Sequence, residues 1–159
     1  MPLEGRRGYD RAVLLPPSPA PSFELPDQDG EKVSSGDLLG AWYLLYWYPM
    51  ADTPGCTVQA EGLAAQIEAF DELGCEVLGA SFDSPEANRN FRSKYRLPFR
   101  LLSDLDKSVA RSFGAVGDSA DAFASRIAHL VDPAGRVVRR YDVEVPEFFA
   151  ELVLDDLEA

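Results

Sequence analysis

One of the two cysteines of this 159-residue chain lies in a segment whose residue types could support redox chemistry. Cys56 follows Thr53, Pro54 and Gly55, at the point where a helical pattern begins. If Thr53 is the N-cap and Pro54 the first helical residue, Cys56 takes the third position, where free backbone N–H groups favour an anion. The sequence therefore predicts that the thiolate is favoured at Cys56, and the thiolate is the nucleophilic form of cysteine.

The same cysteine could instead be inert, because free cysteines are often buried as small hydrophobic residues. Ionisation alone adds little, since an ordinary thiol is already a few per cent thiolate at pH 7. A catalytic thiol would also need hydrogen-bond donors aimed at the oxygen atoms of its substrate. Thr53, the backbone N–H groups near Cys56 and an arginine from another segment are the candidates.

The composition argues against several other functions. The formal net charge of −12 disfavours binding to nucleic acid or to an anionic membrane. No apolar run approaches the roughly 20 residues that span a bilayer. Only a short apolar stretch follows Arg6-Arg7, so we expect a cytoplasmic protein. Two cysteines without a Cys-x-x-Cys motif, together with one histidine, predict neither a disulfide framework nor a metal site.

The elements around Cys56 predict a layered α/β domain with a mixed central sheet over residues 18–159. Residues 1–17 are rich in proline and predict an extended N-terminal arm. A hairpin with an Asp-Gly turn is expected over residues 23–35. Further strands are expected at 41–48, 75–82, 99–102, 126–132 and 136–141, and helices at 54–73, 84–95, 107–113 and 146–157.

Several segments resemble those of a known family. The arrangement Pro-x-x-x-Thr-x-x-Cys at Pro49, Thr53 and Cys56, within YPMADTPGCTVQ, is typical of peroxiredoxins of the bacterioferritin-comigratory or peroxiredoxin Q subfamily. PAPSFELPDQDGEKVSSGDLLG and RIAHLVDPAGRVVRRY extend the resemblance from about Ser18 to the C-terminus. It implies a thioredoxin fold and a thiol-dependent reduction of hydrogen peroxide and organic hydroperoxides that needs no cofactor.

The resemblance also implies a role for each residue of the motif. Cys56 would be the peroxidatic cysteine, which attacks the peroxide and becomes a sulfenic acid. Thr53 would hydrogen-bond the thiolate and the peroxide through its hydroxyl, and Pro49 would shield the pocket from water. Arg126, six residues before Asp132, would match the family's arginine, hold Cys56 ionised and polarise the peroxide.

Several other residues are candidates for the pocket around Cys56. Tyr48 and Gln59 are expected to line the pocket. His129, three residues after Arg126 on the same strand, points to the other face and is expected to be structural. Four other arginines compete with Arg126 in principle, but they lie outside the expected hairpin segment: Arg89, Arg92, Arg96 and Arg100.

The usual resolving cysteine is missing. Many members of the family carry it five residues after the peroxidatic one, where this chain has Glu61, and others carry it in the next helix, which here contains no cysteine. Cys75 is separated from Cys56 by a helix of roughly 28 Å, whereas a disulfide needs Cα atoms within about 7 Å. We therefore expect no resolving cysteine and a one-cysteine mechanism, with thioredoxin, glutaredoxin or a small thiol as reductant.

Three alternatives to a peroxidase remain open. Oxidised Cys56 could pass its oxidation to a partner protein by a mixed disulfide, as in a peroxide sensor or relay. The domain could be a non-catalytic binding module. A thioredoxin-type reductase is weakest, because Val58 and Gln59 stand where a second Cys of Cys-x-x-Cys would be needed. The resemblance favours a monomer or a weak homodimer.

Overall fold

The structure is a computed structural model that describes residues 15–116 and 122–159. Over these residues a six-stranded mixed sheet has the order β1-β8-β7-β4-β5-β6, and β2 and β3 form a separate hairpin. Strands β4, β5 and β6 are parallel, and β7 lies antiparallel beside β4. The strands are β1 (Ser18–Pro19), β2 (Glu24–Pro26), β3 (Lys32–Ser34), β4 (Trp42–Trp47), β5 (Cys75–Ser81), β6 (Arg100–Ser103), β7 (Ile127–Val131) and β8 (Arg136–Asp142). The helices are η3 (Ser35–Leu38), α1 (Pro54–Ala65), α2 (Ile67–Glu72), α3 (Pro85–Tyr95), α4 (Ser108–Phe113), η4 (Pro146–Phe148) and α5 (Phe149–Glu158).

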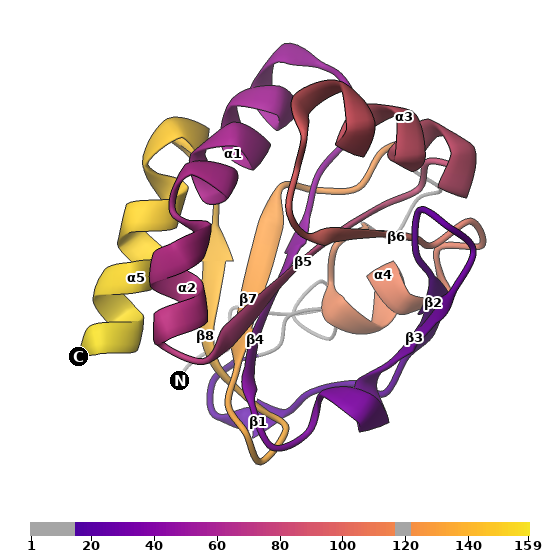
Figure 1. Ribbon diagram of the computed structural model, residues 1–159. Coiled ribbons are helices and arrows are strands. Elements are labelled where there is room, and N and C mark those ends of the chain that lie inside the picture. The colour runs from indigo at the N-terminus through magenta and orange to yellow at the C-terminus, as the bar shows by residue number, and fades with distance from the viewer. Residues whose placement is uncertain (1–14, 117–121) are drawn as a thin grey trace.

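The sheet is covered on both faces (Figure 1). Helices α1, α2 and α5 pack on one face, and α4 with the β2–β3 hairpin packs on the other. Strand β4 is apolar on both sides because it lies between these layers. Leu44 and Tyr46 belong to the core under α1, whereas Leu45 and Trp47 belong to the core under α4. The expected buried strand at 41–48 is therefore confirmed as β4.

The prediction of one helix over residues 54–73 is wrong. The structure has two helices, α1 and α2, which are separated at Gln66, where φ is −107° and ψ is 13°. No glycine or proline marks this position, so the regular spacing of apolar residues did not indicate the break. Gly74 ends α2 with a φ of +70°, as expected of a residue that follows a helix.

The other boundaries fall close to the predicted ones. Ser84 caps α3, because its Oγ accepts a hydrogen bond from the backbone N–H of Ala87 at 3.1 Å. In the β2–β3 turn, Gly30 has a φ of +81°, and Asp27 accepts a hydrogen bond from the backbone N–H of Asp29 at 2.8 Å. The expected closing helix begins as the 3-10 helix η4 and continues as α5.

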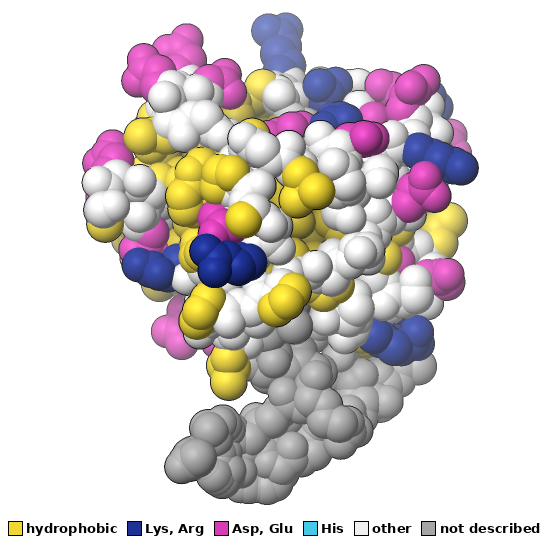
Figure 2. Space-filling view, turned by 90° about the horizontal axis from the view of Figure 1, so that it is seen from below, with side chains coloured by type: hydrophobic (Ala, Val, Ile, Leu, Met, Phe, Trp, Pro, Cys, Tyr) yellow, Lys and Arg dark blue, Asp and Glu magenta, His cyan; other side chains and the backbone are white. Residues whose placement is uncertain are grey.

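The end of the molecule that carries β1 and η3 lies away from the start of α1. Figure 2 shows this end, where hydrophobic side chains gather around a few charged ones. A pocket at this end of the molecule is lined in part by Phe23, Leu39 and Tyr43. Residues 1–14 of the expected arm lie outside the described residues. Among the residues that are described, no helix is long and apolar enough to cross a membrane.

His129, the only histidine of the chain, lies within the core. It is in the middle of β7, has no solvent exposure and packs against the ring of Phe113, with 5.3 Å between ring centroids. Burial, reinforced by the positive charge of Arg140, lowers the pKa of His129 to about 3. The imidazole is therefore neutral in the folded protein at neutral pH, and it lies across the sheet from the core that contains Cys56.

This depressed pKa predicts that stability falls as the pH falls. The unfolded chain binds a proton at His129 near pH 6.5, whereas the folded chain does not until about pH 3, so acid favours unfolding between these values. Between pH 7 and pH 5 we expect a loss of about 2 kcal/mol in the free energy of unfolding from this residue. Urea denaturation at both pH values measures the loss, and His129→Leu is expected to lack that component. An equal loss in both proteins would contradict this assignment.

Candidate active site

Cys56 lies in the first turn of α1, beyond the end of β4. Thr53 occupies the N-cap position with extended backbone, Pro54 begins the helix, and Cys56 is the third helical residue, as the sequence predicts. The Cys56 side chain is 1% exposed. The Thr53 hydroxyl makes no capping hydrogen bond and instead donates to the carbonyl of Met50 at 2.7 Å. The first turn therefore keeps free N–H groups close to the sulfur.

Arg126 brings a positive charge to the sulfur from just before β7. Its Nη1 lies 3.6 Å from Cys56 Sγ and donates to Gln59 Oε1 at 3.0 Å. Gly55 makes room for the guanidinium, because a Cβ at this position would lie 2.9 Å from Arg126 Nη2. The half-buried guanidinium therefore sits against the start of α1, where it can stabilise a thiolate and polarise a bound oxygen.

Hydrogen bonds hold the loop between β4 and α1 against α3 and the residues just before it. The half-buried Pro49 begins this loop, and the backbone N–H of Ala51 donates to Asp83 Oδ2 at 2.8 Å. Asp52 has a φ of +62° and accepts hydrogen bonds from Lys94 Nζ at 2.9 Å and Tyr95 Oη at 2.7 Å. These contacts fix the position from which α1 starts and therefore the position of the thiol.

Tyr48 lies in the same apolar cluster as Cys56, but its hydroxyl is engaged elsewhere. The hydroxyl donates to Asn88 Oδ1 at 2.6 Å, and Asn88 Nδ2 donates in turn to Ser103 Oγ at 3.1 Å. Burial raises the pKa of Tyr48, so the phenol is neutral at physiological pH. Gln59 is fully buried beside Cys56, with its Oε1 held by Arg126.

Tyr46 of β4 is a residue of the site that the motif does not include. Its side chain is fully buried in the cluster that holds Cys56, and its hydroxyl has no hydrogen-bond partner. Its position two residues before Tyr48 was the available signal, because residues i and i+2 of a strand share a face.

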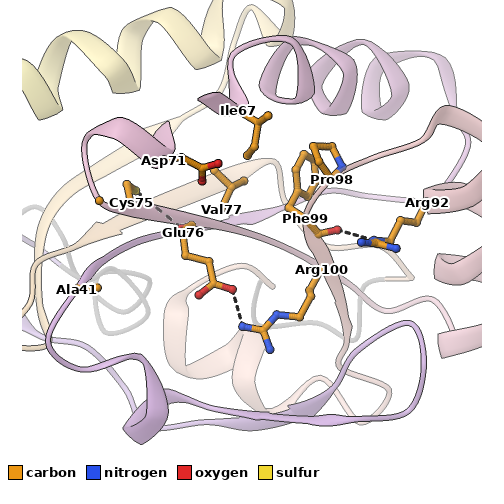
Figure 3. Close-up of a pocket in the computed structure, with 11 residues that line it drawn as sticks. Ala41, Ile67, Asp71, Cys75, Glu76, Val77, Arg92, Pro98, Phe99 and Arg100 are labelled. Carbon is orange, nitrogen blue, oxygen red and sulfur yellow. Dashed lines mark hydrogen bonds and ion pairs between the residues drawn. The ribbon is translucent and has the colours of Figure 1, made fainter. Parts of the chain in front are cut away.

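Cys75 lies at the other end of the sheet. It begins β5 opposite Trp42, the first residue of β4, whereas Cys56 follows the last residue of β4. The length of β4 alone separates these ends by about 17 Å. Figure 3 shows Cys75 beside Glu76 at the edge of a pocket of about 530 Å³. Burial, together with the charge of Glu76, raises the pKa of Cys75 to about 12, so its thiol is a poor nucleophile.

Two of the competing arginines are engaged in that pocket and not at Cys56. Arg92 Nε donates to the carbonyl of Phe99 at 2.9 Å, and Arg100 forms an ion pair with Glu76 (Figure 3). Glu61, at the usual position of a resolving cysteine, is an exposed residue of α1. Among residues 15–116 and 122–159, no group of three or more His, Cys, Asp or Glu side chains could hold a metal ion.

Comparison with known proteins identifies the family of this chain. The AhpC/TSA family model matches residues 16–141. The chain belongs to the AhpC/TSA family. It is 43% identical over 128 residues to peroxiredoxin Bcp of Escherichia coli K12, a match that covers 77% of this chain and 82% of the relative. It is 38% identical to the chloroplastic peroxiredoxin Q of Gentiana triflora, covering 77% of this chain and 56% of that protein. The resemblance to Bcp-type peroxiredoxins is thus confirmed.

Solved structures support the same conclusion. Peroxidoxin BcpB of Mycobacterium tuberculosis aligns with a TM-score of 0.83 and 28% identity, covering 89% of this chain and 95% of that one. A Xanthomonas campestris bacterioferritin comigratory protein, described as having alkyl peroxide reduction activity, aligns with a TM-score of 0.80 and 28% identity, covering 86% and 90%. The thioredoxin fold of peroxiredoxins is therefore confirmed. The protein is a thiol-dependent peroxidase, and the sensor alternative is not favoured.

Proposed function

We propose that this peroxiredoxin reduces hydrogen peroxide and organic hydroperoxides by a one-cysteine mechanism at Cys56. The Cys56 thiolate attacks one oxygen of the peroxide, the O–O bond breaks, and an S–O bond forms. The sulfur is oxidised by two electrons to a sulfenic acid, and the other oxygen takes a proton and leaves as water or alcohol. The observation that carries this proposal is the contact of 3.6 Å between Arg126 Nη1 and Cys56 Sγ at the start of α1.

Each residue around the thiol has a separate role in this proposal. Arg126 stabilises the thiolate and the charge that moves onto the leaving oxygen. Gln59 holds the guanidinium in place through its Oε1. Pro49 and the ring of Tyr48 limit the access of water, since both lie at the end of β4 from which the loop leads to Cys56. The Thr53 hydroxyl donates its hydrogen bond to the carbonyl of Met50, so its lone pairs can accept a hydrogen bond from the O–H of a hydroperoxide.

A second thiol from outside the chain completes the cycle. An external thiol attacks the sulfenic sulfur of Cys56, water leaves, and the mixed disulfide is resolved by another thiol. Thioredoxin, glutaredoxin or a low-molecular-weight thiol can supply this chemistry. Cys75 begins β5 at the end of the sheet far from Cys56, which supports a mechanism without an internal resolving cysteine. We place the protein in the cytoplasm as a monomer or weak homodimer, with residues 1–17 as an extension to the domain at 18–159.

The one-cysteine mechanism is tested with Cys75→Ser. Peroxide consumption by wild type and variant is measured first with dithiothreitol and then with a thioredoxin system. We expect the two proteins to differ by less than about twofold with each reductant, because Cys75 is a core residue in this account. Loss of thioredoxin-supported turnover in Cys75→Ser, with the first oxidation step intact, would make Cys75 the resolving cysteine and overturn the proposal.

Thr53 provides a separate prediction. Thr53→Val keeps the shape of the side chain but removes the hydroxyl, and we expect the second-order rate constant for oxidation by hydrogen peroxide to fall about tenfold, as for one lost hydrogen bond. Thr53→Ser keeps the hydroxyl and is the matched control, with a rate close to that of wild type. Stopped-flow measurement under single-turnover conditions separates this step from reduction. Equal rates for the valine and serine variants would exclude a role for the hydroxyl.

A further inference from the structure

Tyr46 is held rigidly in the middle of the sheet. It pairs with Gly79 of β5 and with Ala128 of β7, and its ring fills the space over Gly79 that a side chain would need. A Cβ at Gly79 would lie 3.1 Å from Cζ and Cε1 of Tyr46, so the hydroxyl-bearing end of the ring rests against this glycine. The ring also meets the edge of Phe99, with 5.9 Å between centroids. The packing therefore determines where the hydroxyl points.

The hydroxyl of Tyr46 is fully buried and has no hydrogen-bond partner. Other buried tyrosines on this face do have partners, since Tyr48 donates to Asn88 and Tyr141 donates to Asp156 at 2.7 Å. An unpaired buried hydroxyl destabilises a fold, and phenylalanine would fill the same space without that cost. The hydroxyl therefore needs another explanation, such as an acceptor that arrives during the reaction.

The side chain of Tyr46 lies in the core that also contains the reacting sulfur of Cys56. Tyr48 belongs to the same buried cluster, and 5.7 Å separates the ring centroids of the two tyrosines. Burial raises the pKa of Tyr46, Cys56 raises this pKa further, and Arg126 lowers it. Gln59, one helical turn after Cys56, has a second unpaired buried donor, because its Nε2 has no partner while its Oε1 is held by Arg126.

Two of the other unpartnered buried groups, those of His129 and Trp47, lie on the opposite face of the sheet. His129 and Trp47 both pack against Phe113 on the opposite side of the sheet, with ring centroids 5.3 and 6.4 Å away. Tyr46 and Gln59 are distinguished from them by their position in the core around Cys56 and Arg126.

We propose that Tyr46 is a further catalytic residue, whose hydroxyl donates a hydrogen bond to the oxygen that passes from the peroxide to Cys56, with Gln59 Nε2 as a second donor. This inference rests on the proposed role of Cys56. In the reaction the S–O bond forms as the O–O bond breaks, and the oxygen that stays on sulfur carries lone pairs that accept these two hydrogen bonds. The departing oxygen takes up a proton and leaves as water or alcohol.

The test compares two reactions of the same thiol in Tyr46→Phe. We expect oxidation by hydrogen peroxide to slow about tenfold, the cost of one lost hydrogen bond from a neutral hydroxyl to the transferred oxygen. Alkylation by iodoacetamide at the same pH should stay within about twofold, because the hydroxyl makes no hydrogen bond to the sulfur of the reduced protein. The melting temperature should stay the same or rise. Tyr141→Phe, which loses a paired hydroxyl on the same face, is the control and should oxidise like wild type.

Two outcomes would overturn the inference. Oxidation of Tyr46→Phe by peroxide at the wild-type rate would leave the hydroxyl without a role in the reaction. An equal loss of peroxide oxidation and of alkylation in Tyr46→Phe would indicate a displaced thiol and not a lost donor. Failure of the proposed function would look different, because wild type and Cys56→Ser would then be oxidised by peroxide equally well.

Discussion

Cys56→Ser is expected to abolish peroxide reduction, with a fall on the order of 10⁴-fold or more, because the serine hydroxyl cannot take up the peroxide oxygen as a sulfenate does. The substitution replaces sulfur by oxygen in a buried position at the start of α1 and should leave the fold intact. Peroxide consumption with dithiothreitol as reductant measures the effect, and circular dichroism confirms folding. Appreciable activity in folded Cys56→Ser would show that another group reacts with the peroxide.

Arg126→Met is expected to slow the oxidation of Cys56 by about 100-fold, the usual cost of one lost donor at a site where charge develops. Methionine keeps much of the length of the side chain but loses both the contact with Cys56 Sγ and the hydrogen bond to Gln59. Stopped-flow oxidation with hydrogen peroxide measures the rate directly.

Arg126→Lys is the matched control for that experiment. Lysine keeps the charge but cannot reach both Cys56 and Gln59 with a planar fork, so we expect an intermediate rate. Arg92→Met tests whether the effect belongs to this arginine, since Arg92 is bonded to Phe99 in the pocket of Figure 3. If Arg126→Met and Arg92→Met slow oxidation equally, Arg126 has no special role.

Local signals carried most of what the sequence could predict. The apolar run of β4, Pro54 after an N-cap residue and Ser84 before Pro85 each act within a few residues, so their structural consequences are visible without the rest of the chain. Cys56 could be placed at the third helical position for the same reason. Arg126 is different, because its contact with Cys56 spans 70 positions and was predicted from the resemblance to the family.

The features that the sequence did not predict either have no local signal or depend on distant partners. The break at Gln66 has no glycine or proline to mark it. Tyr48 is expected to line the pocket, and the sequence does not indicate that its hydroxyl bonds to Asn88, 40 positions away in α3. From the sequence, Tyr46 resembles any other aromatic residue in a buried strand, because only the packed structure shows that its hydroxyl is unpaired and that it shares a buried cluster with Cys56.

The most direct test of the account is to locate the product of a single oxidation. Reduced wild-type protein is treated with one equivalent of hydrogen peroxide, trapped with dimedone, digested and analysed by peptide mass spectrometry. We expect dimedone on the peptide that contains Cys56, with Cys75 still reduced. A disulfide between Cys56 and Cys75 as the main product, or oxidation found first at Cys75, would contradict it.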